Sequence, residues 1–178
     1  MKKELKLINA VVLAIVTLLY LSARNLVFTN NEKQTANDFF LVTKVVDGDT
    51  INLSDGRKVR LIGVDTPEVG YSKKLLRDSK KSGQSIKTIQ ALGRKASDFA
   101  KKLYAGKRVR LEYDVEGKDR YGRTLAYVYL NNGLFVNAEL IKEGYAQVMT
   151  VTPNVKFSDY FLKLQKEARE AKRGLWKD

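Results

Sequence analysis

Residues 45–68 place carboxylates on both sides of an arginine that lies in an apolar run. The arginine is Arg60, and the carboxylates are those of Asp47, Asp49, Asp65 and Glu68. Carboxylates that only make a surface soluble would not need this placement. A site that holds a cation or an anionic ligand would need it, so this stretch is the first candidate for chemistry.

Asp49 and Asp65 are candidate metal ligands. Asp47 has a structural interpretation, because it makes a turn with the glycine that follows, but Asp49 opens a strand, where aspartate is disfavoured. Asp65 ends the following strand, and two carboxylates brought together repel each other unless a cation lies between them. Without histidine or cysteine in the chain, that cation would be a hard one held by oxygens, Ca²⁺ or Mg²⁺. The alternative is two separately solvated aspartates.

Arg60 favours the binding site over the solvated surface. A guanidinium in an apolar strand needs an anionic partner, because burying it unpaired is costly. That partner is either Asp49 or Asp65, or it is a bound phosphate, which arginine grips with two parallel hydrogen bonds.

A second cluster lies in the segment "DRYGRTLAYVYL", which begins at Asp119. Arg123 stands at the start of a strand, where it could complete a phosphate clamp, and Tyr121 could donate to a phosphate or stack on a base. An ordinary hairpin with exposed charges is the alternative.

The missing residue types limit the chemistry. The 178 residues contain no cysteine and no histidine, which excludes disulfides, catalytic thiols, Ser-His-Asp triads and every imidazole base. The net charge is +13, from 33 Lys and Arg against 20 Asp and Glu. This positive field favours a polyanionic partner, with nucleic acid ahead of an anionic surface or an inert basic one.

The hydrophobic pattern predicts a small α+β domain after residue 38. The expected strands cover about 39–46, 49–53, 58–64, 107–115 and 124–130. The expected helices cover about 94–104, 136–143 and 156–172, and residues 69–85 are expected to form a mobile surface loop. Five strands with a helix between the third and fourth indicate an OB-fold, a five-stranded Greek-key β-barrel with three helices. Another small antiparallel α+β fold is the alternative.

The N-terminal segment lies outside this domain. Three lysines precede an apolar run over residues 7–21, which is typical of a signal peptide. A membrane anchor is the alternative, since the run is slightly short of the roughly 17–25 residues of a span but no clear cleavage site follows. Residues 1–23 are therefore expected to export the chain, as a signal peptide or as an anchor, and residues 24–38 to form a polar linker.

The chain resembles the staphylococcal nuclease (thermonuclease) family in several motifs. They are "DGDT", "RLIGVDTPE", "DRYGR" followed by "LAYVY", and the closing "EAREAKRGLW". Each motif alone is weak, but their order and spacing are specific, and the likeness covers residues 39–178. It implies the OB-fold and a Ca²⁺-dependent hydrolysis of DNA and RNA that leaves 3′-phosphates.

The resemblance also assigns roles around the expected metal. It makes the carboxylates of Asp49 and Asp65 and the backbone carbonyl of Thr66 the Ca²⁺ ligands. Glu68 matches the residue that activates the attacking water. Asp47 would not bind the ion itself but would hold the metal ligands in place.

On the substrate side, Arg60 and Arg123 match the two phosphate-binding arginines of the family, and Tyr121 and Arg120 would contact the nucleotide. The chain departs from the family's archetype in two places. The segment after the expected catalytic glutamate is longer and rich in lysine, and Thr150 and Thr152 stand where the archetype has two pocket tyrosines.

We therefore predict a monomeric, exported, Ca²⁺-dependent endonuclease that is secreted or is attached to the outer face of the cell membrane through residues 7–21. The alternative is a non-catalytic nucleic-acid-binding OB-fold module at the cell surface. Loss of a carboxylate or an arginine from the site would favour that alternative, and none is lost here.

Overall fold

The computed structural model describes residues 15–20, which are helical, and residues 39–177. They belong to two separate units, 1–38 and 39–178. No helix among the described residues is long and apolar enough to cross a membrane. The expected signal peptide or anchor at 1–23 lies mostly, and the linker at 24–38 wholly, outside the described residues, so both stay predictions.

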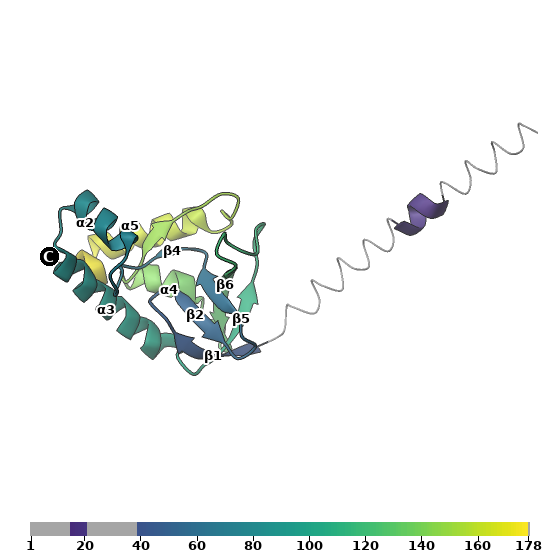
Figure 1. Ribbon diagram of the computed structural model, residues 1–178, viewed down its shortest axis with the longest axis horizontal. Coiled ribbons are helices and arrows are strands. Elements are labelled where there is room, and N and C mark those ends of the chain that lie inside the picture. The colour runs from purple at the N-terminus through teal and green to yellow at the C-terminus, as the bar shows by residue number, and fades with distance from the viewer. Residues whose placement is uncertain (1–14, 21–38, 178) are drawn as a thin grey trace, which may run out of the picture. The chain divides into compact units, whose positions relative to one another are not determined.

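Five strands close into a barrel in the order β1-β2-β3-β6-β5. Figure 1 shows the barrel with helices beside it. Neighbouring strands are antiparallel except β3 and β6, which are parallel. The parallel pair requires a long crossover, and the chain between these two strands contains helices. The α+β class and the five-stranded OB barrel are confirmed. The barrel strands are β1 (Phe39–Val45), β2 (Thr50–Leu53), β3 (Lys58–Leu61), β5 (Arg108–Glu112) and β6 (Thr124–Leu130).

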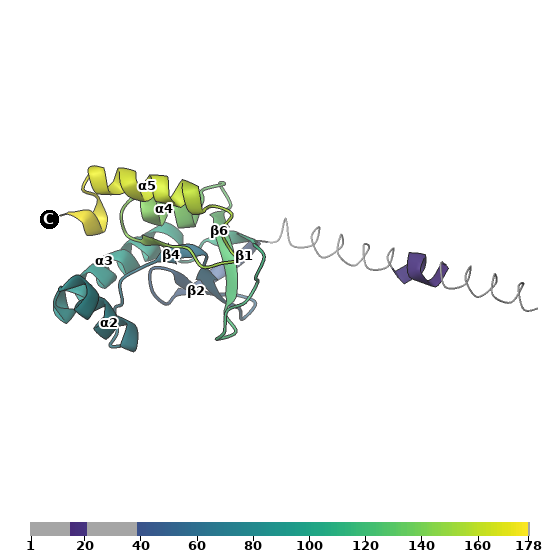
Figure 2. The ribbon, with the colours of Figure 1, turned by 90° about the horizontal axis from the view of Figure 1, so that it is seen from above.

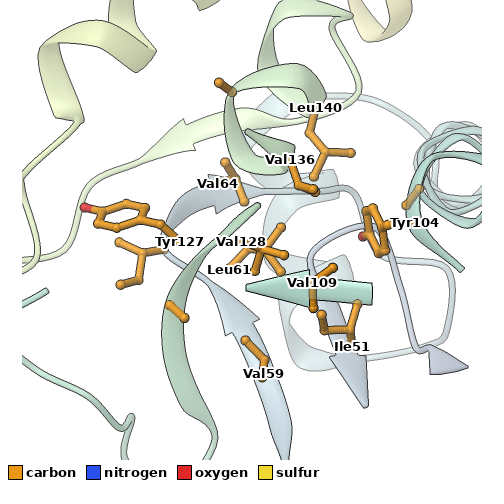
Figure 3. Close-up of a cluster of buried hydrophobic side chains, with 14 of the residues drawn as sticks. Ile51, Val59, Leu61, Val64, Tyr104, Val109, Tyr127, Val128, Val136 and Leu140 are labelled. Atoms are coloured by element: carbon orange, nitrogen blue, oxygen red, sulfur yellow. The ribbon is translucent and has the colours of Figure 1, made fainter. Parts of the chain in front are cut away.

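The barrel interior is apolar because alternate residues of each strand point inward. Side chains from several strands meet there, with the Tyr104 ring at one end (Figure 3). Each of the labelled strand residues is almost fully buried: Ile51, Val59, Leu61, Val64, Val109, Tyr127 and Val128. This rigid core fixes the strand ends that carry the candidate site.

The three predicted helices are present as α3 (Ile86–Tyr104), α4 (Val136–Lys142) and α5 (Ser158–Glu170). The first begins earlier than expected, because the Ser85 hydroxyl accepts the Thr88 N–H at 3.1 Å and caps it. A 3₁₀ turn, η1 (Gly174–Trp176), follows α5. Figure 2 shows α4 and α5 packed together on the barrel.

The prediction of a mobile loop over 69–85 is wrong, because the structure has a further helix there, α2 (Lys73–Ser82), packed against α3 (Figures 1 and 2). The Ser72 hydroxyl accepts the Leu75 N–H at 3.0 Å, and Gly83 ends the helix in a left-handed conformation. Leu75 is completely buried. Two capping residues and one buried leucine therefore hold this segment as a helix, although its lysine-rich composition suggested a mobile loop.

The expected strand 58–64 is divided in two. β3 ends at Leu61, and β4 (Gly63–Asp65) leaves the barrel to pair with β7 (Gln147–Met149). The bend needs glycine, since Gly63 has a φ of 77° and a Cβ there would lie 2.5 Å from the Phe161 ring. This bend carries Asp65 away from the barrel wall and toward α2.

Candidate active site

Asp49 is positioned by the turn that precedes it. The Asp47 carboxylate accepts the Asp49 N–H at 3.1 Å. Gly48 lets the turn press against Thr66, because a Cβ there would lie 2.5 Å from the threonine methyl. The Tyr104 hydroxyl donates to the Gly48 carbonyl at 2.8 Å, so the core holds this turn in place.

The Asp49 carboxylate is almost fully buried and is surrounded by hydrogen-bond donors. One oxygen accepts from the Thr66 N–H at 2.8 Å and the Thr66 hydroxyl at 3.1 Å. The other accepts from the Thr50 hydroxyl at 3.1 Å and from Arg60 Nη1. Burial raises the pKa of Asp49, and the Arg60 guanidinium offsets part of this effect.

Arg60 joins the two candidate metal ligands. Its Nη1 pairs with Asp49 and its Nη2 lies 2.9 Å from an Asp65 oxygen. Burial alone would lower the pKa of Arg60, but the two carboxylates outweigh it and raise the pKa, so the side chain stays charged. The sequence left open whether Arg60 pairs with Asp49, with Asp65 or with a bound phosphate. In the structure it pairs with both aspartates.

Lys74 of α2 supplies a second cation at the site, which the sequence did not predict. Its Nζ lies 3.2 Å from Asp65 Oδ2 and 3.4 Å from Glu68 Oε1, and it donates to the Thr66 carbonyl at 3.1 Å. It also lies 3.3 Å from Asp78 Oδ2, one helical turn along α2. Burial opposes the charged form, but the carboxylates raise the pKa of Lys74 above its ordinary value.

Glu68 is held in place by its own backbone. Gly93 of α3 allows close packing, since a Cβ there would lie 2.6 Å from the Glu68 carbonyl oxygen. Gln90 donates to the next carbonyl, that of Val69, at 3.2 Å. The Glu68 side chain is 32% exposed, so the backbone at this position is held by α3 while the carboxylate is open to water.

These oxygens fit a hard cation. Asp65, Thr66 and Glu68 already direct oxygens at one positive charge, the Lys74 ammonium, and carboxylate and carbonyl oxygens are the ligands that Ca²⁺ prefers. Asp49 adjoins this group, but its oxygens are engaged by Arg60 and by hydroxyl and amide donors. Within residues 15–20 and 39–177, no three acidic side chains are already grouped as a metal centre.

Arg123 is oriented by Asp119 in the loop before β6. Asp119 Oδ2 accepts from Arg123 Nε at 2.7 Å, and its Oδ1 accepts the Tyr121 and Arg123 amides, each at 2.9 Å. Burial acts to raise the pKa of Asp119, but its hydrogen bonds from Arg123 outweigh this and lower it. The exposed Tyr121 ring lies beside the guanidinium groups of Arg120, at 4.8 Å, and Arg123, at 5.6 Å.

The expected substrate residues line one cavity of about 490 Å³. The parallel register sets Val59 of β3 opposite Thr124 of β6. Arg60 follows Val59 in β3 and Arg123 precedes Thr124 at the start of β6, so both arginines lie near this point of the barrel wall. Their cavity also contains Arg120, Tyr121, Met149 and Val151, whereas Thr150 and Thr152 are not among its lining residues.

A second cavity, of about 690 Å³, adjoins the first. Its wall includes Asp65, Lys74 and Asp78, and Met149 contributes to both cavities. The structure therefore groups the arginines and the tyrosine at the first cavity and the carboxylates of Asp65 and Asp78 at the second. The sequence analysis did not identify Lys74 and Asp78 as site residues. They are four residues apart and follow a serine that could cap a helix, so they could have been expected on one helix face.

Comparison with known proteins places this arrangement in a family. A family model described as "Staphylococcal nuclease homologue" matches residues 58–178. The chain is 41% identical over 152 residues to a thermonuclease of Staphylococcus intermedius, covering 84% of this chain and 82% of that protein. It is 40% identical over 151 residues to a thermonuclease of Staphylococcus hyicus, covering 83% and 79%. Endonuclease YncB of Bacillus subtilis is 36% identical over 153 residues, covering 83% and 65%.

Proposed function

The chain belongs to the staphylococcal nuclease family, and on this basis we propose that it is an exported, Ca²⁺-dependent endonuclease that hydrolyses DNA and RNA and leaves 3′-phosphates. One observation supports the proposal above the others. Arg60 and Arg123 line one cavity next to the oxygens of Asp65, Thr66 and Glu68, which converge on one positive charge.

The two arginines would bind the phosphodiester. Asp119 accepts a hydrogen bond from Arg123 Nε. Asp49 and Asp65 pair with the two Nη atoms of Arg60. These contacts position both guanidinium groups at the cavity before substrate arrives. As phosphorus becomes five-coordinate its oxygens gain negative charge, which fixed charged donors stabilise more strongly than they stabilise the ground state.

Glu68 would orient the attacking water and accept its proton on a carboxylate oxygen. Its exposure and its fixed backbone suit that role. Ca²⁺, when bound through Asp49, Asp65 and the Thr66 carbonyl, would supply positive charge to a phosphate oxygen. No step needs a histidine, in accord with its absence from the chain.

The substrate and the export rest on separate observations. The net charge of +13 favours a polyanion, and α2 adds exposed lysines, Lys73, Lys80 and Lys81, of which Lys81 lines the second cavity. These could contact phosphates beyond the cleaved linkage. Export rests on the basic flank and apolar run of residues 2–21, and recovery of the chain only from the cytoplasmic fraction of its source cells would contradict it.

Cleavage of plasmid DNA is expected to require Ca²⁺ and to be supported poorly by Mg²⁺. Magnesium demands a compact octahedron at about 2.0–2.1 Å and gives up water reluctantly, whereas the oxygens here are a backbone carbonyl and carboxylates of separate residues, a mixed set that the more adaptable coordination of Ca²⁺ accepts. The measurement is the initial rate in each metal and with a chelator. Equal rates in the two metals, or cleavage that survives chelation, would contradict the assignment.

A further inference from the structure

The ammonium group of Lys74 lies where the proposed function requires a metal ion. Its Nζ is 3.1 Å from the Thr66 carbonyl oxygen and 3.2 Å from Asp65 Oδ2, and those two residues are expected Ca²⁺ ligands. It is also 3.4 Å from Glu68 and 3.3 Å from Asp78. One positive charge of the chain itself therefore contacts two of the three residues through which Ca²⁺ would bind.

This contact is built into the fold. Leu75, the next residue, is completely buried, and Ser72 caps the first turn of α2. The Lys74 side chain is itself only 23% exposed. Asp78 follows four residues later on the same helix face, where its carboxylate meets the ammonium. Helix α2 thus brings both a cation and an additional carboxylate to the site.

Lys74 and a calcium ion cannot hold this position together. Calcium binds oxygens at about 2.3–2.6 Å, so an ion on Asp65 Oδ2 and the Thr66 carbonyl would lie close to the present position of the ammonium. Two positive charges a few ångströms apart in a partly buried site repel strongly. The ammonium must therefore move away before the ion can bind.

We propose that α2 completes the metal site of this chain: Lys74 occupies the cation position until Ca²⁺ displaces its ammonium, and Asp78 then adds a carboxylate to the bound ion. The inference rests on the proposed Ca²⁺ dependence and adds two residues to it. Lys74 sets the Ca²⁺ concentration at which the enzyme becomes competent, because the apparent Kd equals the intrinsic Kd divided by the fraction of molecules whose site is open.

The first test is Ca²⁺ binding to the full chain, measured by calorimetry after removal of metal with a chelator. Lys74→Met keeps the apolar stem and removes the ammonium. It is expected to tighten Ca²⁺ binding about tenfold or more, the factor for an ammonium that occupies the site at least nine-tenths of the time. Lys73→Met removes an equal charge from an exposed position on α2 and is expected to change Kd much less. Equal affinity in Lys74→Met and the wild type would overturn the proposal.

A second readout separates displacement from a general charge effect. Acetylation of Lys74 by an amine-reactive reagent, followed by mass spectrometry, is expected to be slow in chelator and several-fold faster in saturating Ca²⁺. The exposed Lys73 serves as the internal reference, because its rate should not depend on the metal. If Ca²⁺ leaves the Lys74 rate unchanged or lowers it, the ammonium is not displaced and the proposal fails.

Asp78 is tested in the Lys74→Met background, where loss of its ion pair with the lysine cannot offset the effect. Adding Asp78→Asn is expected to weaken Ca²⁺ binding several-fold, whereas adding Asp98→Asn, at an exposed position of α3, should not. Unchanged affinity on adding Asp78→Asn would overturn the role of that carboxylate. If neither the wild type nor any variant binds Ca²⁺, the proposed cofactor fails together with this inference. If all bind it equally, only the inference fails.

Discussion

Replacing Glu68 with glutamine is expected to lower kcat by about 10²–10⁴-fold, the range that a positioned general base contributes. The amide keeps the shape of the side chain but cannot accept the proton of the attacking water. Substrate binding uses Arg60, Arg123 and the positive surface, so KM should change little. The measurement is steady-state cleavage of an oligonucleotide in saturating Ca²⁺.

Stability provides the control for this variant. The substitution removes only a partly exposed ion pair, at 3.4 Å, between Glu68 and Lys74. Such pairs contribute about 0–1 kcal/mol to the free energy of unfolding. The Tm should therefore remain close to that of the wild type. Glu170→Gln, an exposed change on α5, should leave both kcat and Tm unaltered. A Glu68→Gln enzyme that keeps wild-type kcat would show that another group activates the water.

Replacing Arg60 with lysine is expected to lower kcat/KM by about 10²–10³-fold, the cost of removing one fixed hydrogen-bond donor from a transition state. Arg60 reaches Asp49 through Nη1 and Asp65 through Nη2. Lysine has one nitrogen, so it can neither bridge the two carboxylates nor grip a phosphate with two parallel hydrogen bonds. The formal charge is unchanged, so the loss would reflect geometry.

The same variant should also lower the Tm, because Asp49 is buried and Arg60 is its counter-charge. The kcat/KM values should therefore be measured at a temperature well below the Tm of the variant, where all of the enzyme is folded. Arg108→Lys, at an exposed position of β5, is the matched control and should keep wild-type kcat/KM. Full activity in Arg60→Lys would remove this arginine from the phosphate site.

The barrel was predictable because its strands are short runs rich in β-branched and aromatic residues, and Asp-Gly turns at 47–48 and 55–56 separate the first three. Helix α2 was not, because its stability depends on one buried residue, Leu75, in a run of lysines. The division of the strand 58–64 depends on a contact between Gly63 and Phe161, which are distant in the sequence. Tertiary contacts of this kind leave no periodic signal.

The proximity of Asp49, Arg60 and Asp65 could be inferred because an arginine in an apolar strand needs a partner. The register supports it, since Thr50 of β2 lies opposite Arg60 of β3. The spacing of Lys74 and Asp78 could have suggested a shared helix face, but not the contact of Lys74 with the site, because lysines are abundant in this segment and only the docking of α2 on α3 selects one of them. A structure was needed to distinguish it from its neighbours.

The most direct test of hydrolysis is the fate of a 5′-labelled single-stranded oligonucleotide mixed with the full chain. Shorter labelled products are expected in Ca²⁺ and none in chelator, and the enzyme itself is the only nuclease in the mixture. The new 3′ ends are also expected to carry phosphate, which phosphatase treatment would reveal as a shift in mobility. An oligonucleotide that is bound but stays intact in Ca²⁺ would contradict the account and identify a non-catalytic binding module, and products with 3′-hydroxyl ends would contradict the proposed bond cleavage.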